Sequence, residues 1–217
     1  MNVLLIHGMG RTPLSLLGLA RRVRSAGHSP ELVGYLSATQ RFDDIVARVG
    51  ARTAAMAASG VPYVVVGHSL GGLLARAALA AAPARMPLPL HLIMLGTPNQ
   101  PSSLAGRLQR VPPFRWATGE SGARLASADF FRSLPPPAVP YTIIAGTRGP
   151  RGRLSAFGDE HNDGKVAVSE TRVHRHDAPI ELPVRHTFMM NDARVQALIL
   201  SVLERTRVSR AQVVSHD

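Results

Sequence analysis

Ser69 lies in the segment 67–72, Gly-His-Ser-Leu-Gly-Gly, between a valine-rich stretch and an alanine- and leucine-rich one. A serine nucleophile must project from a tight turn between a strand and a helix, and that turn strains the backbone. Gly67 and Gly71 fit such a turn because they carry no Cβ that would collide with neighbouring backbone. A helix that begins after Ser69 also directs free N–H groups at developing negative charge. The pattern therefore predicts a serine nucleophile.

Two further side chains could complete this chemistry. Asp163 precedes a glycine after a predicted strand at 141–145, and His186 precedes the last predicted helix. A histidine activates a serine hydroxyl by accepting its proton, and a carboxylate orients that histidine. An aspartate before glycine also occurs in simple turns, so other carboxylates compete for the role. These rivals are Asp159, Glu160 and Asp177.

Negative charge that develops on a substrate needs hydrogen-bond donors. The first predicted strand ends in the segment 7–10, His-Gly-Met-Gly, and a glycine-flanked turn can present a backbone N–H there. We assign the N–H groups of Met9 and Leu70 to this oxyanion hole. His7 is expected to shape the turn by hydrogen bonding. For His68, packing and tuning of the pocket remain equally open.

Apolar runs alternate with amphipathic stretches, which places these residues at the ends of strands. Strands are predicted at 2–7, 31–35, 62–67, 88–95 and 141–145, and helices at 13–27, 42–58, 70–82 and 193–208. This alternation implies an α/β fold with a mostly parallel sheet and helices on both faces. The proline-rich stretch 98–140 breaks the pattern, and we expect an irregular insertion, with room for short helices, that covers the active site. A second loop spans 146–164.

Length and composition fit one domain over residues 1–217, with a frayed tail at 209–217. The 45% hydrophobic content argues against disorder, and no apolar run is long enough to span a membrane. The absence of cysteine excludes disulfides, thiolate metal sites and a cysteine nucleophile. The N-terminus carries no basic region and favours a strand over a secretory signal, so a cytoplasmic location is expected.

The net charge of +11 comes almost entirely from arginine, since Lys165 is the single lysine among 25 basic residues. The arginines are scattered and aromatic residues make up 5%, which argues against nucleic-acid binding. Contact with an anionic membrane surface stays open but is not required. Arg148, Arg151 and Arg153 share the loop of the candidate acid, where they could hold an anionic headgroup or an acyl carrier.

Together these motifs resemble the α/β-hydrolase superfamily, and within it the lipase- and esterase-like branch. The resemblance covers nearly the whole chain. Its markers are the turns at 7–8 and 67–72, Gly-Thr-Pro at 96–98, Asn-Asp-Gly at 162–164, and His186 ahead of the last helix. It implies that Ser69 is the nucleophile, that His186 is general base and then acid, and that Asp163 orients His186.

Two features depart from the family pattern. The chain begins at what resembles the family's third strand, so we expect a minimal sheet of about six strands. Lipases of this type that bind calcium carry acidic ligands near the histidine, whereas here Asp192 alone follows it closely. His174 and His176 lack a third ligand. We therefore expect no required metal and no cofactor.

The resemblance implies hydrolysis of a small acyl ester or lipid substrate through an acyl-enzyme on Ser69. The same residues would serve an acyltransferase or a thioesterase, because the motif does not fix the acceptor. Two non-enzymatic alternatives are a silent hydrolase-fold binding protein and a membrane-surface protein that uses the arginine excess. Oligomeric state is not encoded in these patterns.

Overall fold

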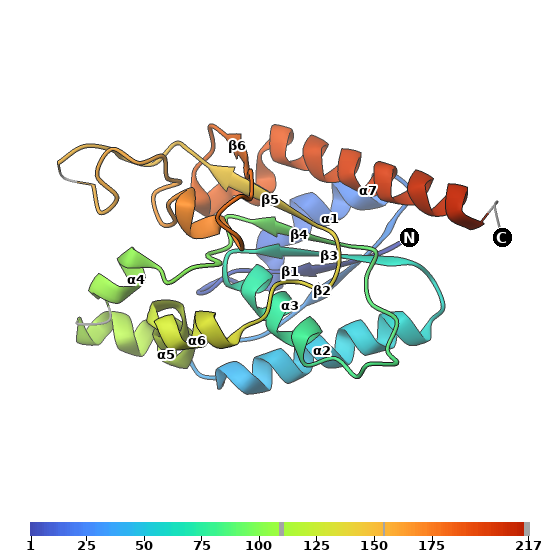
Figure 1. Ribbon diagram of the computed structural model, residues 1–217, viewed down its shortest axis with the longest axis horizontal. Helices are drawn as coiled ribbons and strands as arrows, with labels where there is room; N and C mark the ends of the chain where they lie inside the picture. The colour runs from blue at the N-terminus through green and yellow to red at the C-terminus, as the bar shows by residue number, and fades with distance from the viewer. Residues whose placement is uncertain (109–110, 154, 215–217) are drawn as a thin grey trace.

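Six parallel strands form one sheet in the order β2-β1-β3-β4-β5-β6. The computed structural model describes residues 1–108, 111–153 and 155–214. The strands are β1 (Asn2–Ile6), β2 (Ser29–Val33), β3 (Tyr63–His68), β4 (His91–Leu95), β5 (Tyr141–Gly146) and β6 (Ile180–Leu182). All strand arrows point to one end of the molecule (Figure 1), which is where the predicted site residues follow their strands. The fold class predicted from the sequence is confirmed.

Helices cover both faces of the sheet. They are α1 (Leu17–Ser25), α2 (Phe42–Ala58), α3 (Leu70–Ala80), α4 (Ser103–Leu108), α5 (Pro112–Ala126), α6 (Ala128–Ser133) and α7 (Ala193–Val214). Three 3₁₀ segments lie at η1 (Pro13–Leu16), η2 (Ser169–Thr171) and η3 (His186–Asn191). Helices α1 and α7 lie on one face, and α2 and α3 lie on the other (Figure 1).

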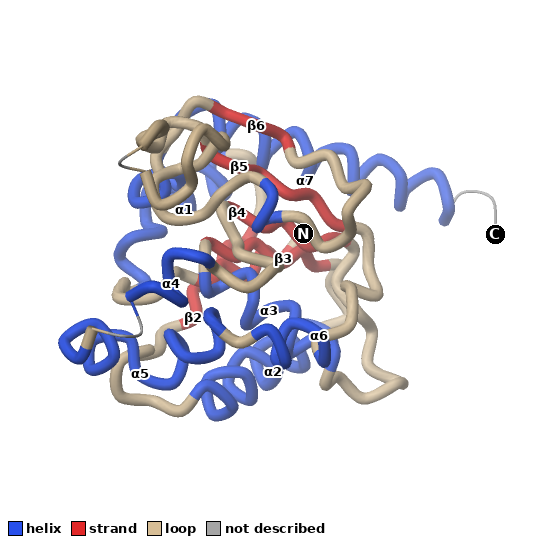
Figure 2. Tube along the Cα trace, turned by 60° about the vertical axis from the view of Figure 1, so that its left-hand side comes forward, coloured by secondary structure: helices blue, strands red, loops and turns tan. Residues whose placement is uncertain are grey.

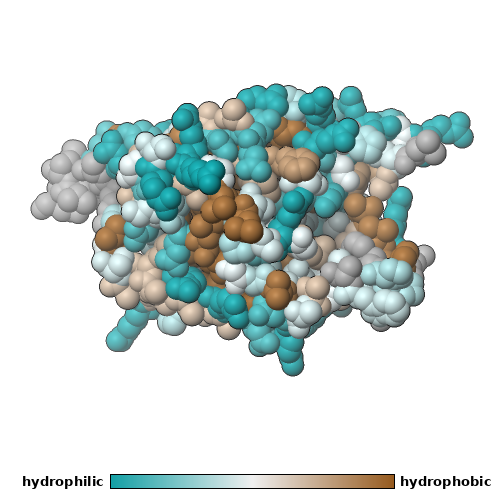
Figure 3. Space-filling view, turned by 180° about the vertical axis from the view of Figure 1, so that it is seen from behind, coloured by the Kyte–Doolittle hydropathy of each residue, from teal (hydrophilic) through white to brown (hydrophobic). Residues whose placement is uncertain are grey.

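The alternation of side chains along β1 explains this layering. Val3 and Leu5 are fully buried in a cluster with α1 and α7, whereas Leu4 and Ile6 are fully buried in a cluster with α2 and α3. Successive strand residues point to opposite faces, so an unbroken apolar run requires cover on both sides. The surface seen from behind carries one larger hydrophobic patch near the middle of the view and smaller ones elsewhere, with hydrophilic residues around them (Figure 3). None of the described helices has the length and hydropathy to cross a membrane.

The insertion at 98–140 is more regular than predicted, because α4, α5 and α6 make it largely helical. Helix α5 is bent at Gly119, which has a φ of 56°. Figures 1 and 2 both show α5 and α6 beside α2, at the end of the sheet where the strand arrows point. The insertion therefore lies at the same end as the predicted site.

Arg76 of α3 holds the C-terminal end of this insertion through hydrogen bonds. Its buried guanidinium donates to the carbonyls of Leu134 and Pro135 and to Asn99 Oδ1. Burial lowers the pKa of Arg76 to about 10. Asn99 in turn donates to the carbonyl of Thr171, which links the insertion to the loop that carries the candidate acid.

Several elements differ from the predicted bounds: β2 lies two residues earlier than 31–35, β4 begins at His91 instead of 88, and the stretch 13–27 divides into η1 and α1. Strand β6 was not predicted, because it has three residues, of which Ile180 is exposed, and pairs only with the end of β5. Helix α7 runs to Val214, beyond the expected end at 208, so part of the expected frayed tail is helical. The rest of that tail, 215–217, lies outside the described residues.

Candidate active site

Ser69 stands at the turn between β3 and α3, in the backbone geometry predicted for a nucleophile. Its φ and ψ are 54° and −122°, and it is the one non-glycine residue with a positive φ among the described residues. Such an angle is costly for a side chain that carries a Cβ, so the surrounding structure must hold it in place. This backbone conformation directs Ser69 Oγ out of the turn and toward His186, which follows β6 at the same end of the sheet.

Two glycines allow the turn to pack closely. A Cβ on Gly67 would collide with the backbone of Gly72, and a Cβ on Gly71 would collide with the carbonyl oxygens of Ile6 and His7. Both positions therefore require glycine for steric reasons. The close approach places the first turn of α3 directly against the end of β1, where the predicted oxyanion loop begins.

Hydrogen bonds join the three residues that were predicted to act together, Asp163, His186 and Ser69, in that order. His186 Nε2 is 2.9 Å from Ser69 Oγ, and His186 Nδ1 is 2.6 Å from Asp163 Oδ2. A carboxylate only accepts hydrogen bonds, so Nδ1 carries the proton and Nε2 is free to accept the proton of Ser69. His186 and Asp163 are buried, being 5% and 2% exposed. This arrangement can transfer a proton from the serine hydroxyl to the imidazole.

Asp163 is held rigidly by the backbone around it. Its Oδ1 accepts from the backbone N–H groups of Lys165 and Val166 at 2.9 and 2.8 Å, and its own carbonyl accepts from the N–H of His186 at 3.0 Å. The rival carboxylates have other partners or face solvent. Asp177 accepts from Tyr141 and from two backbone N–H groups, Glu160 accepts from Ser169 N–H, and Asp159 is exposed.

His68 contacts His186, which local sequence patterns could not reveal. Its Nε2 donates to the backbone carbonyl of His186 at 3.0 Å, and the two rings lie 5.0 Å apart. Burial, followed by the charge of His186, lowers the pKa of His68 well below its usual range. His68 is therefore neutral near pH 7 and holds the segment that presents His186.

The loop predicted to complete an oxyanion hole abuts the nucleophile turn. A Cβ on Gly8 would approach His68 Nδ1 to 2.9 Å and Ser69 Cβ to 3.1 Å. His7 Nδ1 donates to the carbonyl of Gly8 at 2.9 Å, and Tyr35 donates to the carbonyl of His7 and stacks on its ring at 4.1 Å, so contacts of the His7 side chain and backbone hold the loop. Met9 follows in this loop, and Leu70 is the first residue of α3, where helix N–H groups have no intrahelical partner.

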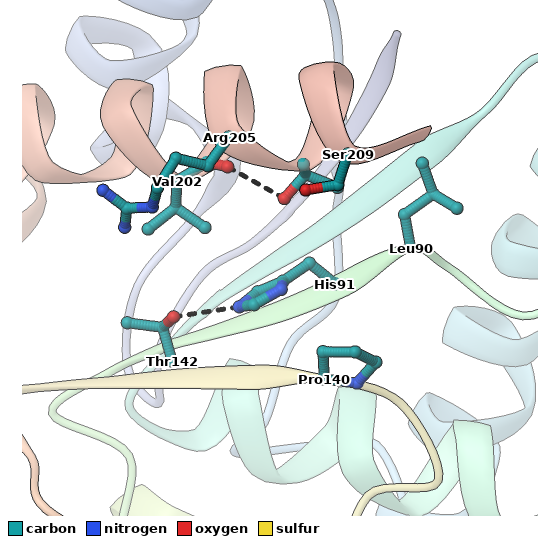
Figure 4. A pocket seen from close by; sticks show the side chains of 8 residues that line it. Leu90, His91, Pro140, Thr142, Val202, Arg205 and Ser209 are labelled. Carbon is teal, nitrogen blue, oxygen red and sulfur yellow. Dashed lines mark hydrogen bonds between the residues drawn. The ribbon is translucent and has the colours of Figure 1, made fainter. Parts of the chain in front are cut away.

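A separate groove of about 570 Å³ lies near the opposite end of the sheet. It is lined by Leu90, His91, Pro140, Thr142, Val202, Arg205, Thr206 and Ser209. His91 Nε2 lies 2.9 Å from Thr142 Oγ1 there, and α7 forms the other wall (Figure 4). None of Ser69, His186 and Asp163 lines this groove.

Within the described ranges no three histidine, aspartate or glutamate side chains gather as a metal site. His174 and His176 stack with ring centroids 5.3 Å apart. Asp192, the acidic residue after His186, forms an ion pair with Arg194, which lowers the pKa of Asp192 to about 2.

Buried histidines predict a loss of stability in mild acid. Burial lowers the pKa of His7, His28, His68 and His91, so these groups bind protons more readily in the unfolded chain. Stability is then fully present above pH 6.5 and falls as the pH drops below it, by at most about 1.4 kcal/mol per pH unit for each group. Burial raises the pKa of the Glu170 carboxyl, so this group contributes more stability as the pH falls. It is one group that opposes the effect of four histidines.

Urea unfolding at pH 7.5, 6.5 and 5.5 measures this dependence. The variant His68→Gln, which keeps an N–H donor, should show a shallower decline than the wild type. An unfolding free energy at pH 5.5 equal to that at pH 7.5 would contradict the account.

Comparison with known proteins places this geometry in a family. The sequence pattern of the "Alpha/beta hydrolase family" matches residues 3–211. No curated protein sequence matches the chain. Solved structures with a similar fold include a Bacillus licheniformis lipase, BlEst2, in its mature form. Its TM-score is 0.72 at 19% identity, over 93% of this chain and 91% of that one.

Two further structures share the fold. The phospholipase PlaB from Legionella pneumophila has a TM-score of 0.62 at 22% identity, over 80% of this chain and 44% of that one. The thioesterase RedJ of the prodiginine pathway in Streptomyces coelicolor has a TM-score of 0.58 at 14% identity, over 94% and 85%. At such identities the likeness concerns the fold, whereas the sequence match over residues 3–211 shows that the chain belongs to the alpha/beta hydrolase family.

Proposed function

We propose that the protein is a serine hydrolase that cleaves carboxylic esters. The observation that carries this proposal is the pair of hydrogen bonds that links Asp163 to His186 and His186 to Ser69, with Ser69 on a strained turn. A serine that only caps a helix needs neither a strained backbone angle nor a buried imidazole beside its hydroxyl. The geometry therefore supports catalysis over a silent binding role.

The reaction proceeds in two halves. His186 Nε2 takes the proton of Ser69 Oγ as the oxygen attacks the ester carbonyl, and the resulting imidazolium is stabilised by Asp163. His186 then protonates the leaving alcohol, which departs and leaves an acyl-serine. Water activated by His186 attacks the acyl-serine, and the proton returns to Ser69 as the acid is released.

The negative charge on the carbonyl oxygen is stabilised by the backbone N–H groups of Met9 and Leu70. Both groups belong to segments that pack against Ser69, and the N-terminus of α3 adds a favourable dipole. Backbone donors fixed in this way need no reorganisation during the reaction.

The insertion that contains α4, α5 and α6 is proposed to contact the acyl chain. Val111 and Trp116 are large apolar side chains on it that are 45% and 77% exposed. The double variant Val111→Ser/Trp116→Ser should lower kcat/KM for octanoate esters at least about threefold relative to acetate esters, because apolar contact scales with buried area. Val61→Ser/Val208→Ser removes exposed apolar side chains at the far end of the fold and should leave this ratio unchanged. Equal ratios in both variants would argue against the acyl-chain assignment.

Turnover of p-nitrophenyl esters of graded acyl length tests the proposed function directly. Release of p-nitrophenol by the wild type, dependent on Ser69, is the expected result. The same triad supports thioester hydrolysis or acyl transfer, so matched thioesters and added alcohol acceptors belong in the same assay. A folded protein that turns over none of these substrates would contradict the proposal.

A further inference from the structure

A pocket of about 540 Å³ opens against two members of the proposed triad, His186 and Asp163. Its walls come from the loop after β5, which lies at the end of the sheet to which the strand arrows point (Figure 1), and from the segment that carries His186. Three cationic side chains line it, namely Arg148, Lys165 and Arg185. The pocket is therefore continuous with the site and strongly positive.

These three cations have no ion-pair partner among the described residues, and all three are exposed. Unpaired cations are common in the described residues, where five arginines form ion pairs, so the distinguishing feature is that three cations gather in one pocket beside the proposed triad. The positive charge of the pocket is thus left for a ligand.

A fourth cation borders the pocket. Arg11 donates to the carbonyl of Thr187 at 3.2 Å, and its guanidinium lies 5.8 Å from the ring centre of Phe188. Thr187 and Phe188 both line the pocket. Partial desolvation and then the charge of Arg11 lower the pKa of Lys165, while Asp163 opposes this.

The one carboxylate in the pocket offsets only part of this charge, because Asp163 is a single anion and Arg148, Lys165 and Arg185 are three cations. The oxygens of Asp163 already accept from His186 and from two backbone N–H groups. A phosphate monoester carries a charge between about −1.5 and −2 at pH 7 and accepts several charge-assisted hydrogen bonds, so it matches several neighbouring cations better than a single carboxylate does. Arginine binds it in a bidentate fashion.

The chemistry of the triad fixes which half of the substrate faces this pocket. His186 must protonate the leaving oxygen, so the leaving group lies on the side of His186. The acyl half is then directed toward the insertion. We propose that the substrate is an acyl ester or thioester whose leaving group bears a phosphate, held by Arg148, Lys165 and Arg185. This inference rests on the proposed ester hydrolysis.

Two matched pairs of substrates test the proposal. The first pair is 1-octanoylglycerol 3-phosphate and 1-octanoylglycerol, and the second is the octanoyl thioester of 4′-phosphopantetheine and that of pantetheine. We expect kcat/KM for the phosphorylated member to exceed that of its neutral partner at least about tenfold in one pair at low salt, and less at high salt. The pair that shows the preference distinguishes a lipid headgroup from a carrier-type thiol.

Charge-removal variants locate the effect. Arg148→Gln/Lys165→Gln/Arg185→Gln should reduce the ratio between phosphorylated and neutral substrate to below about two, and this ratio is independent of the fraction of active protein. Arg22→Gln/Arg24→Gln/Arg85→Gln removes the same charge from exposed positions at the other end of the sheet and should retain the ratio.

Each outcome has one meaning. Cleavage of the neutral members without any phosphate preference overturns this inference and leaves the proposed function standing. Retention of the ratio in the pocket variant, or its equal loss in the distant variant, also overturns it. Failure to cleave any of the four substrates, by a protein that hydrolyses p-nitrophenyl esters, overturns this inference alone, and failure with the p-nitrophenyl esters as well overturns the proposed function with it.

Discussion

Replacement of Ser69 by alanine should lower kcat for ester hydrolysis by at least about 10³-fold, because the acyl-enzyme can no longer form. Removal of the nucleophile in triad enzymes has effects of this size or larger, and the residual rate comes from binding and the oxyanion donors. The measurement is steady-state hydrolysis of p-nitrophenyl esters by purified Ser69→Ala and wild-type protein.

Ser209→Ala provides a matched control, since Ser209 lines the distant groove and lies far along α7. It should retain the wild-type rate. Near-normal turnover in Ser69→Ala would show that the esterase chemistry, if present, uses another group.

Replacement of Asp163 by asparagine should lower kcat by about 10⁴-fold, the magnitude known for the equivalent change in serine proteases. The volume of the side chain is kept, but an amide that faces His186 Nδ1 stabilises the wrong tautomer, in which Nε2 carries the proton and cannot accept one from Ser69. The hydrogen bond of 2.6 Å between His186 and Asp163 makes this site sensitive to that change.

The rival carboxylates supply the comparison. Asp159 and Glu160 lie on the same loop as Asp163, and among the described residues neither forms a hydrogen bond with His186. The variants Asp159→Asn and Glu160→Gln therefore serve as controls. Both variants should keep at least about half of the wild-type kcat. A larger loss in either of them than in Asp163→Asn would assign the acid differently.

Local sequence patterns were sufficient to predict a helix or strand where its own apolar residues mark the side that is buried. Helix α2 has the predicted bounds, Phe42–Ala58, because Phe42, Ile45, Val49 and Met56 recur at helical spacing and are all buried. The strand β3 and the turn at Ser69 were likewise predictable, since a β-branched run and two obligatory glycines are local signals. Ser69 and Asp163 could be selected because each comes after a recognisable strand, and His186 because it precedes the recognisable last helix.

The features that were missed depend on contacts between distant segments. Short helices were compatible with the pattern of the insertion, but their bounds, the kink at Gly119 and the contact of Arg76 with the carbonyls of Leu134 and Pro135 were not predictable from it. The contact of His68 with the carbonyl of His186 joins residues more than a hundred positions apart. Strand β6 exists through pairing with β5 and not through its own sequence.

Incubation of the purified protein with a fluorophosphonate, followed by intact mass analysis and peptide mapping, tests the central claim most directly. Such a probe reacts with a serine hydroxyl that is activated by a neighbouring base. The account predicts a single adduct on Ser69, absent in His186→Ala. A folded wild-type protein that forms no adduct, or one labelled at another serine, would contradict it.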